Sequence, residues 1–155
     1  MAKVGTIALF AGTKLPKEWH FCDGQSMNVD SNPLLFLILG NRYGGDGRVI
    51  FQLPKLEDKF GMRYIICIEG DYAGQISYEV DFSEDNLVGM AVPFKGSQAP
   101  NGWAFCDGKK LDPTSEDRYL CAMVQSKFDL IEHRNFILPK TGTESYVICK
   151  QGYML

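Results

Sequence analysis

Short runs of apolar and β-branched residues alternate with turns rich in glycine, proline and aspartate along the chain. The content of Thr6–Phe10 is typical of a strand, and Trp19–Cys22 alternates apolar and polar positions like a second strand. Pro16 marks a turn between them, and Asp23-Gly24 predicts a tight turn afterwards, because glycine adopts positive φ at little steric cost. Two later runs predict closing strands: Tyr64–Ile68 and Tyr146–Cys149.

Two segments depart from this pattern of strands and turns. Leu34–Leu39 is continuously apolar, and it is preceded by Pro33 and followed by Gly40. This pattern predicts a short buried helix with proline in its first turn that ends at Gly40. The side chain of Asn32 is placed to cap that helix. Ser115–Val124 is also expected to be helical, with acidic residues in its first turn.

The chain contains an internal repeat. Gly5–Gly12 is matched by Gly89–Gly96, and the same offset of 84 positions continues through the next segment. Six residues recur at this offset: Pro16, Trp19, Phe21, Cys22, Asp23 and Gly24 return as Pro100, Trp103, Phe105, Cys106, Asp107 and Gly108. Two further anchors follow in the same order: Phe51–Lys55 returns as Phe136–Lys140, and Tyr64–Cys67 returns as Tyr146–Cys149. Three anchors in one order indicate a tandem duplication.

The duplication divides the chain into two small units joined by a connector. We place the first unit at residues 1–72, the connector at 73–86 and the second unit at 87–155. Alternating apolar residues in the connector predict a packed strand with one buried face: Ile76, Tyr78, Val80 and Phe82. The expected fold class is α+β and β-rich, with two tandem domains that each combine antiparallel strands and one short helix. Units of about 70 residues lie near the lower limit of independent stability, so we expect them to support each other.

Composition narrows the possible partners. Hydrophobic residues make up 45% of the 155 residues, which is enough to build folded cores. The net charge is −3 and no long run of Lys or Arg occurs, so nucleic acid is not an expected partner. The longest apolar run, Leu34–Leu39, is far shorter than the roughly 20 residues of a spanning helix, so membrane insertion is not expected. No secretory signal pattern is visible, which leaves open whether one was removed.

Four segments of the first unit form a recognisable set: Gly5–Gly12, Pro16–Gln25, Leu39–Arg48 and Phe51–Pro54. With these segments the unit resembles the phage tail collar domain, and it is especially similar to the microcystin-dependent-protein branch of that family. The second unit resembles the family only in part, because Gln125–Arg134 stands where the Tyr-Gly-Gly-Asp-Gly loop belongs. In the first unit Lys55–Lys59 replaces the usual Asp-Leu-Arg-Gly-Arg, so an anion site built on those arginines is not expected.

The resemblance implies a β-rich domain of phage tail fibres, contractile injection particles or bacterial surfaces, which acts in attachment or as a structural joint. It implies other protein subunits of such an assembly as partners, and a location in the virion, in the particle or at the cell surface. Fibre members of the family form trimers. A shared fold does not establish function, so the individual residues are weighed next.

The five cysteines leave two interpretations open. Cys22 and Cys67 recur as Cys106 and Cys149, so each unit has an equivalent pair that is either a disulfide or two buried free thiols. Cys121 has no repeat partner and is expected in the core.

No constellation of residues predicts catalysis or metal binding. There is no Cys-x-x-Cys spacing, and His20 and His133 are not repeat-equivalent, so neither a metal site nor a cofactor is expected. His20 lies two residues from Cys22, but no third group completes a nucleophilic arrangement. We therefore do not expect an enzyme.

The two tryptophans have two conceivable uses. An exposed ring would suit stacking on a sugar face, whereas a buried ring would anchor the core. Because Trp19 and Trp103 occupy equivalent positions beside Phe21 and Phe105, core packing is favoured.

The segment Tyr43-Gly44-Gly45-Asp46-Gly47-Arg48 is the candidate binding site. Its glycines let the backbone fold tightly and approach a ligand, while Tyr43 offers an aromatic face, Asp46 an acceptor and Arg48 a donor fork. It lacks the terminal Gly-Lys-Ser or Gly-Lys-Thr of a phosphate-binding loop. A tight loop whose charges hold its own ends is the alternative.

Together these features predict a non-enzymatic module that binds or assembles, engaging protein or glycan through its loops. A purely architectural joint or cap of a larger assembly is the alternative. A hydrolase of a surface polymer is less favoured, because it needs paired carboxylates at a defined separation. Asp23 and Asp107 recur, but each lies in a glycine turn where a structural use is sufficient.

Overall fold

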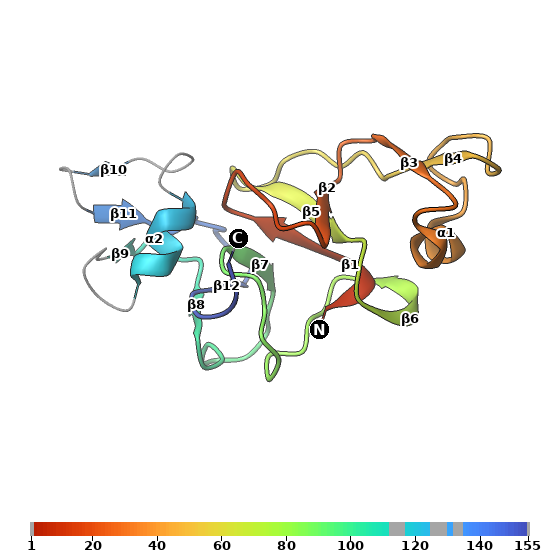
Figure 1. Cartoon of the computed structure of the whole chain (residues 1–155). Coiled ribbons are helices and arrows are strands. Elements are labelled where there is room, and N and C mark those ends of the chain that lie inside the picture. Colours follow the sequence, from red (N-terminus) through yellow and green to blue (C-terminus); the bar gives the residue numbers. More distant parts are fainter. Residues whose placement is uncertain (1, 112–116, 125–129, 132–134, 155) are drawn as a thin grey trace.

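The computed structural model describes residues 2–111, 117–124, 130–131 and 135–154. In these residues the chain is rich in antiparallel strands and has two short helices, α1 (Pro33–Leu39) and α2 (Arg118–Val124), which confirms the predicted β-rich α+β class. Figure 1 shows a central group of strands between two smaller lobes, one containing α1 and the other α2.

Strands occur in both units and in the segment that joins them. The first half contains β1 (Lys3–Phe10), β2 (Trp19–Phe21), β3 (Ser26–Asn28), β4 (Ile50–Gln52), β5 (Arg63–Cys67) and β6 (Asp71–Ser77). The second half contains β7 (Met90–Pro93), β8 (Trp103–Phe105), β9 (Lys110–Leu111), β10 (Leu130–Ile131), β11 (Asn135–Ile137) and β12 (Tyr146–Cys149). The predicted strands are confirmed as β1, β2, β5 and β12. The small sheets β3–β4 and β10–β11–β9, one in each lobe, were not predicted.

One sheet runs through both units. Its strands lie in the order β2-β5-β1-β7-β12-β8, so the first strand of one unit pairs with the first strand of the other. β1 and β7 are antiparallel, with Leu9 opposite Ala91, and Ala91 is the repeat counterpart of Ile7. This register relates the units by an approximate two-fold axis that passes between Ala8 and its own counterpart, Val92.

The repeat extends to individual hydrogen bonds. Trp19 lies opposite Cys67, and Trp103 lies opposite Cys149. The amide of each tryptophan donates to the proline carbonyl three residues earlier, at 3.1 Å in the first unit and 3.0 Å in the second. A second matched pair joins each cysteine after the tryptophan strand to the closing strand: Cys22 N to Tyr64 O and Cys106 N to Tyr146 O, both 2.9 Å. These matches confirm two tandem copies of one structure.

Both tryptophans lie in a core that the two units share on one face of the sheet. Their side chains are buried. The Nε1 of Trp19 donates to the hydroxyl of Tyr153 at 2.7 Å, and the ring of Trp103 packs edge-on against Phe82 at a centroid distance of 4.9 Å. The prediction that these rings serve the core is therefore confirmed.

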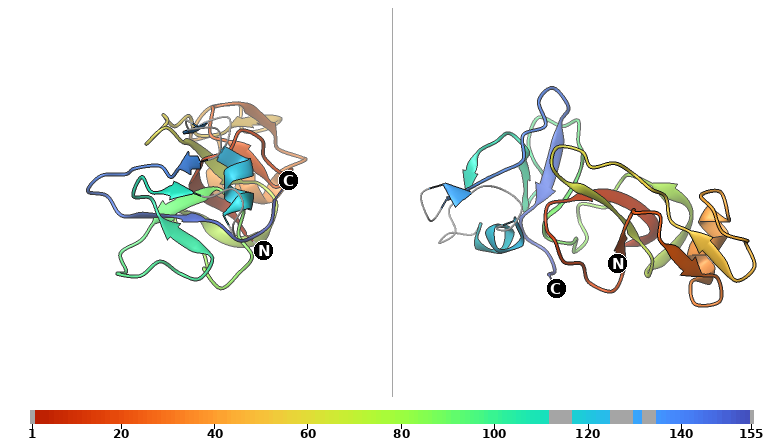
Figure 2. Two further views of the ribbon diagram at one scale, coloured as in Figure 1. Left: turned by 90° about the vertical axis from the view of Figure 1, so that its left-hand side faces the viewer. Right: turned by 90° about the horizontal axis from the view of Figure 1, so that it is seen from above.

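The opposite face of the sheet carries the two lobes. Ile66 packs with Leu35 of α1, whereas its counterpart Ile148 packs with Leu120 of α2. Successive strand residues point to opposite faces, which allows one sheet to serve the shared core and both lobes. The lobes lie toward opposite ends of the molecule (Figure 2).

The first unit is longer than the second between the Leu-Pro turn and the closing strand. Ten residues run from Lys55 to Tyr64, but only seven run from Lys140 to Tyr146. We call Lys59–Met62 the bridging loop, because it contacts the second unit.

Three contacts made by the bridging loop hold the units together. Met62 is fully buried in the core around α2. The ring of Phe60 packs edge-on against Tyr146 at 5.4 Å, and the Nζ of Lys59 lies 3.1 Å from the Oε1 of Glu144. The two-fold symmetry is therefore broken by a loop that belongs to one copy alone.

The helix α1 confirms two of its three predicted end signals. Pro33 is its first residue, and the amide of Gly40, which has a φ of 57°, donates to the carbonyl of Phe36 at 2.7 Å. The predicted side-chain cap by Asn32 is wrong. Its Nδ2 donates instead to the carbonyl of Asn28, because the preceding turn offers that acceptor within 3.0 Å.

The helix α2 is confirmed from Arg118 onward. Residues 115–116 of the predicted helix lie outside the described residues. Asp117 precedes the helix, and its Oδ1 lies 3.4 Å from the Nζ of Lys150. Because α2 begins at Arg118, no acidic residue occupies its first turn in the described part of the chain.

The connector is a strand only in its first part. β6 ends at Ser77 and pairs in parallel with β1. Ile76 packs toward the core of the first lobe, whereas Val80 and Phe82 pack against the core shared by the units, and Tyr78 is half exposed. The expectation of one strand with one buried face through Phe82 is therefore wrong, because the chain leaves the sheet and crosses to the other core. The limits assigned to the units and the connector stay a prediction.

Candidate functional site

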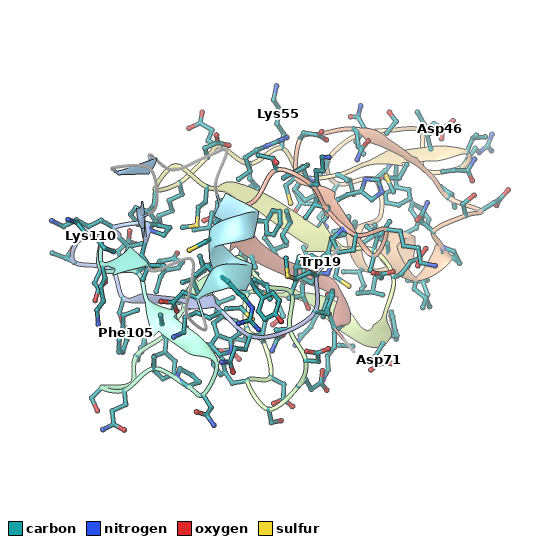
Figure 3. All side chains as sticks on the ribbon, turned by 60° about the vertical axis from the view of Figure 1, so that its left-hand side comes forward. Trp19, Asp46, Lys55, Asp71, Phe105 and Lys110 are labelled. Carbon is teal, nitrogen blue, oxygen red and sulfur yellow. The ribbon has the colours of Figure 1, made fainter. Side chains whose placement is uncertain are left out.

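The loop Tyr43–Arg48 lies at the outer end of the first lobe, between α1 and β4. Figure 3 shows Asp46 at this end of the molecule, far from Lys110 in the second lobe. Gly45 has a φ of 90°, and a Cβ atom there would lie only 2.6 Å from the carbonyl oxygen of Ile50. A larger residue would displace backbone, so this position requires glycine.

Asp46 holds the loop in its shape. Its Oδ1 accepts hydrogen bonds from the amides of Arg48, Val49 and Ile50, at 2.9, 3.0 and 3.2 Å. These bonds favour the ionised form and lower the pKa of the carboxyl group, with the Arg48 amide contributing most. One oxygen of this exposed side chain is thus committed to the loop itself.

Asp46→Ala is expected to loosen the loop without unfolding the protein. Without the acceptor, the amides of Arg48, Val49 and Ile50 lose their partner, so their hydrogen exchange is expected to become faster. The exchange of these three amides, measured by NMR, checks the prediction. Asp71→Ala removes an exposed aspartate from β6 as a control, and unchanged exchange in Asp46→Ala would contradict the role given to this carboxylate.

The same interaction depends on pH in a defined direction. Because the folded pKa of Asp46 is below its ordinary value of 3.8, its contribution is complete above that value and is lost as the pH falls through the folded pKa. In that acid range the three amides are therefore expected to lose their slower exchange, so that their exchange approaches that of the Asp46→Ala variant at the same pH.

The outer surface of this lobe is apolar as well as polar. Tyr43 and Ile50 are exposed, Val49 is 61% exposed, and Leu37 on α1 is 68% exposed. Arg48 is exposed beside them. Val49 and Ile50 were not among the predicted site residues, although this apolar pair directly after the loop Tyr43–Arg48 was a visible signal.

Arg42 fixes the start of the loop. Its guanidinium donates from Nη2 to the carbonyl of Ile38 at 2.6 Å and from Nε to the carbonyl of Leu39 at 3.3 Å, which satisfies carbonyls at the end of α1. The same group lies 5.9 Å from the ring centre of Tyr43. Tyr43 is therefore held beside a cation whose hydrogen bonds serve the helix.

The corresponding segment of the second unit, Gln125–Arg134, falls largely outside the described residues. Only Leu130–Ile131 of it is described, as strand β10 paired with β11. The difference between the two loops is therefore one of sequence: the second unit has no Tyr-Gly-Gly-Asp-Gly segment.

The cysteines are buried free thiols rather than disulfides. Cys22 packs in the core around α1, whereas Cys67 packs with Trp19 on the opposite face of the sheet. Their counterparts are divided in the same way. Burial raises the pKa of four thiols to about 12: Cys22, Cys67, Cys106 and Cys149. A thiol with such a pKa is a poor nucleophile near neutral pH.

The other polar candidates serve local structure. The Nδ1 of His20 lies 2.6 Å from the Nε2 of Gln25. The Oδ1 of Asp23 accepts from the amide of Gln25, and the Oδ1 of Asp107 accepts from the amide of Lys109, both at 3.0 Å. The repeated aspartates therefore close equivalent turns.

Neither metal sites nor membrane-spanning helices are found in the described part of the chain. No group of three or more His, Cys, Asp or Glu side chains there is arranged to hold a metal ion. No helix in that part is long and apolar enough to cross a membrane.

Comparison with known proteins gives a match in both units. The family model described as Phage Tail Collar Domain matches residues 5–61 and residues 89–143, which together exceed half of the chain. No curated protein matches the chain. The two matched segments contain the two tryptophan strands and the two Leu-Pro turns.

Proposed function

The chain belongs to the phage tail collar domain family, a family of structural modules of phage tails, and we propose that it is a non-enzymatic binding and assembly module. The assembly is a phage tail, a contractile injection particle or a bacterial surface adhesion complex. Its partners are other subunits of that assembly, and its location is the virion, the particle or the cell surface. Contact with a protein or a glycan is made through the loop Tyr43–Arg48.

The fixed shape of this loop is the observation that carries the proposal. Three amide bonds to Asp46 hold the loop, so little ordering is required when a partner binds. The side chains around it combine an aromatic ring, a guanidinium and exposed aliphatic groups. Exposed apolar groups with a polar rim are typical of protein contact sites.

An architectural joint is the second candidate, and the continuous sheet supports it. Because β1 pairs with β7 and Met62 is buried in the second unit, the two copies form one body with a shared core. Such a body would transmit a fixed orientation between neighbouring subunits. Trimer formation, as in fibre members of the family, is part of this second proposal.

Replacing Tyr43 and Arg48 together by alanine is expected to weaken attachment of assembled particles by about tenfold or more, because aromatic and arginine side chains dominate binding sites. Both side chains are exposed, so incorporation of the protein into particles is expected to continue. Co-sedimentation of purified particles with host cells measures attachment, and immunoblotting of the particles measures incorporation.

Tyr119→Ala provides the matched control. Tyr119 is comparably exposed but lies on α2 in the other lobe. Attachment that is unchanged in the double variant contradicts binding through the loop and favours the architectural joint. Loss of incorporation in the double variant, with Tyr119→Ala normal, makes the loop an assembly contact instead.

A further inference from the structure

The bridging loop is a two-residue hairpin turn with an unusual backbone. Lys59 and Met62 exchange two hydrogen bonds, each 2.9 Å long, so only Phe60 and Gly61 lie between the paired residues. Both of these residues have a positive φ, 54° for Phe60 and 76° for Gly61. Positive φ at both central positions is characteristic of a type I′ turn.

Phe60 is a poor residue for this position. Glycine, asparagine and aspartate are the usual residues there, because the left-handed region crowds the Cβ atom of most L-residues. In the described part of the chain, no other non-glycine residue has a positive φ. The second unit has a turn between its Leu-Pro segment and its closing strand, and there the positive φ, 65°, falls on Gly142. The strain at Phe60 is therefore offset by contacts of its side chain and of its neighbours.

These contacts come from the second unit. The ring of Phe60 packs edge-on against Tyr146 at 5.4 Å. The Nζ of Lys59 lies 5.3 Å from the ring centre of Phe60 and 5.7 Å from that of Tyr146. It donates a hydrogen bond of 3.1 Å to the Oε1 of Glu144. Met62, at the other end of the turn, is buried in the core around α2. One copy thus stabilises a turn that the sequence of the other copy disfavours.

The pairing of the two units in the sheet does not pass through this turn. β1 pairs with β7, and beyond the last paired residues the amide of Ala11 donates to the carbonyl of Gly89 at 2.9 Å. The side chain of Phe60, by contrast, is only half buried, and Glu144 is exposed. Partly exposed contacts open at a lower free energy than strands in a buried core.

We propose that the bridging loop is a latch whose closed shape is imposed by the second unit. The backbone of Phe60 keeps its left-handed conformation while its ring is held against Tyr146 and Lys59. Without these contacts the turn opens and releases the second unit locally, while β1 and β7 stay paired. Backbone strain of this kind persists only where the surrounding structure determines the conformation. The inference concerns the joint between the units and not the binding of a partner, so it goes beyond the function proposed above.

Two substitutions of Phe60 separate backbone strain from ring packing. Phe60→Ala removes the ring but keeps a Cβ atom at positive φ, so the amides of Lys59 and Met62 are expected to lose about tenfold in hydrogen-exchange protection. Phe60→Asn also removes the ring but gives the pair of residues that type I′ turns prefer, so protection is expected to stay within about twofold of the unsubstituted chain. Amide exchange of the full chain, measured by NMR, compares the two variants.

Glu144→Gln tests the part played by the second unit. It removes an exposed ion pair, so the protection of the Lys59 and Met62 amides is expected to fall about two- to fivefold, as for a surface ion pair. In the Phe60→Asn background the same substitution is expected to have no effect, because the turn then holds its own shape. An equal effect in both backgrounds contradicts a shape imposed by the second unit.

Phe36→Ala is the matched control, because Phe36 is also half buried but lies on α1, where its φ is not positive. It is expected to leave the protection of the turn amides unchanged. Exchange at the amide of Ala11 reports on the pairing of the units, and a parallel loss there in Phe60→Ala would contradict a local latch. The melting temperature of each variant establishes that it is folded. Equal losses in Phe60→Ala and Phe60→Asn, or no loss in Phe60→Ala, overturn the inference.

Discussion

Phe10→Ala is expected to lower the free energy of unfolding by about 3–5 kcal/mol, the loss typical of a buried aromatic side chain. Phe10 is fully buried in the core that the two units share. It lies at the end of β1 where that strand pairs with β7, and its ring is 6.5 Å from that of Phe21. Alanine would leave a cavity at the junction of the units. Urea denaturation of the full chain measures the change.

The repeat provides a control for this substitution. Phe94 is the counterpart of Phe10 but is only half buried, on the other side of the two-fold axis. Phe94→Ala is expected to cost no more than about half as much, because less apolar surface is removed from water in the folded protein. Equal losses for the two variants would show that burial at the shared core does not set the difference.

Met62→Ala is expected to cost about 2–5 kcal/mol, although the residue belongs to the first unit and packs in the second. Its side chain is fully buried with Leu120 and Cys121 of α2 and with Ile148 of β12. Removing it would leave a cavity under α2 and weaken the link between the lobes. Urea denaturation monitored by tryptophan fluorescence is the measurement.

Two further variants define the expected scale. Met62→Leu keeps most of the volume and is expected to cost less than about 1.5 kcal/mol. Leu37→Ala, at a position that is 68% exposed, is expected to change stability by no more than about 0.5 kcal/mol. A loss in Met62→Ala as small as that in Leu37→Ala would contradict the bridging role of this residue.

The sequence was informative wherever local pattern and repeat agreed. The tryptophan strand was predicted at Trp19–Cys22 and is found at Trp19–Phe21, and the closing strand of the second unit has its predicted bounds. Side-chain alternation and turn glycines determine such features locally. Because of the duplication, a strand predicted in one unit also predicts a strand at the equivalent position of the other unit.

Features that depend on distant segments could not be predicted in the same way. Pairing of β1 with β7 joins strands about 80 residues apart, and no local pattern encodes it. The crossing of the connector between two cores and the burial of Met62 also depend on contacts between residues far apart in the sequence. Asn32 does not cap α1, because its side chain is held by the hydrogen bond that its Nδ2 donates to the carbonyl of Asn28.

The candidate loop shows a similar division. Its glycines and Asp46 were identified from sequence, and the structure gives Gly45 a positive φ and Asp46 three amide donors. The exposed aliphatic residues Val49 and Ile50 and the position of Arg42 depend on tertiary packing. Binding through this loop stays a prediction until the particle experiment is done.

The bridging loop has a consequence for how the two gene halves can change over time. A lone copy with this sheet register could pair with an identical copy, and every mutation would then appear twice. In one chain that carries both copies, each half can change by itself, as the bridging loop shows: Met62 of the first unit packs in the core around α2. One half can keep a glycine loop while the other accepts the divergent Gln125–Arg134 segment, provided that it still completes the sheet.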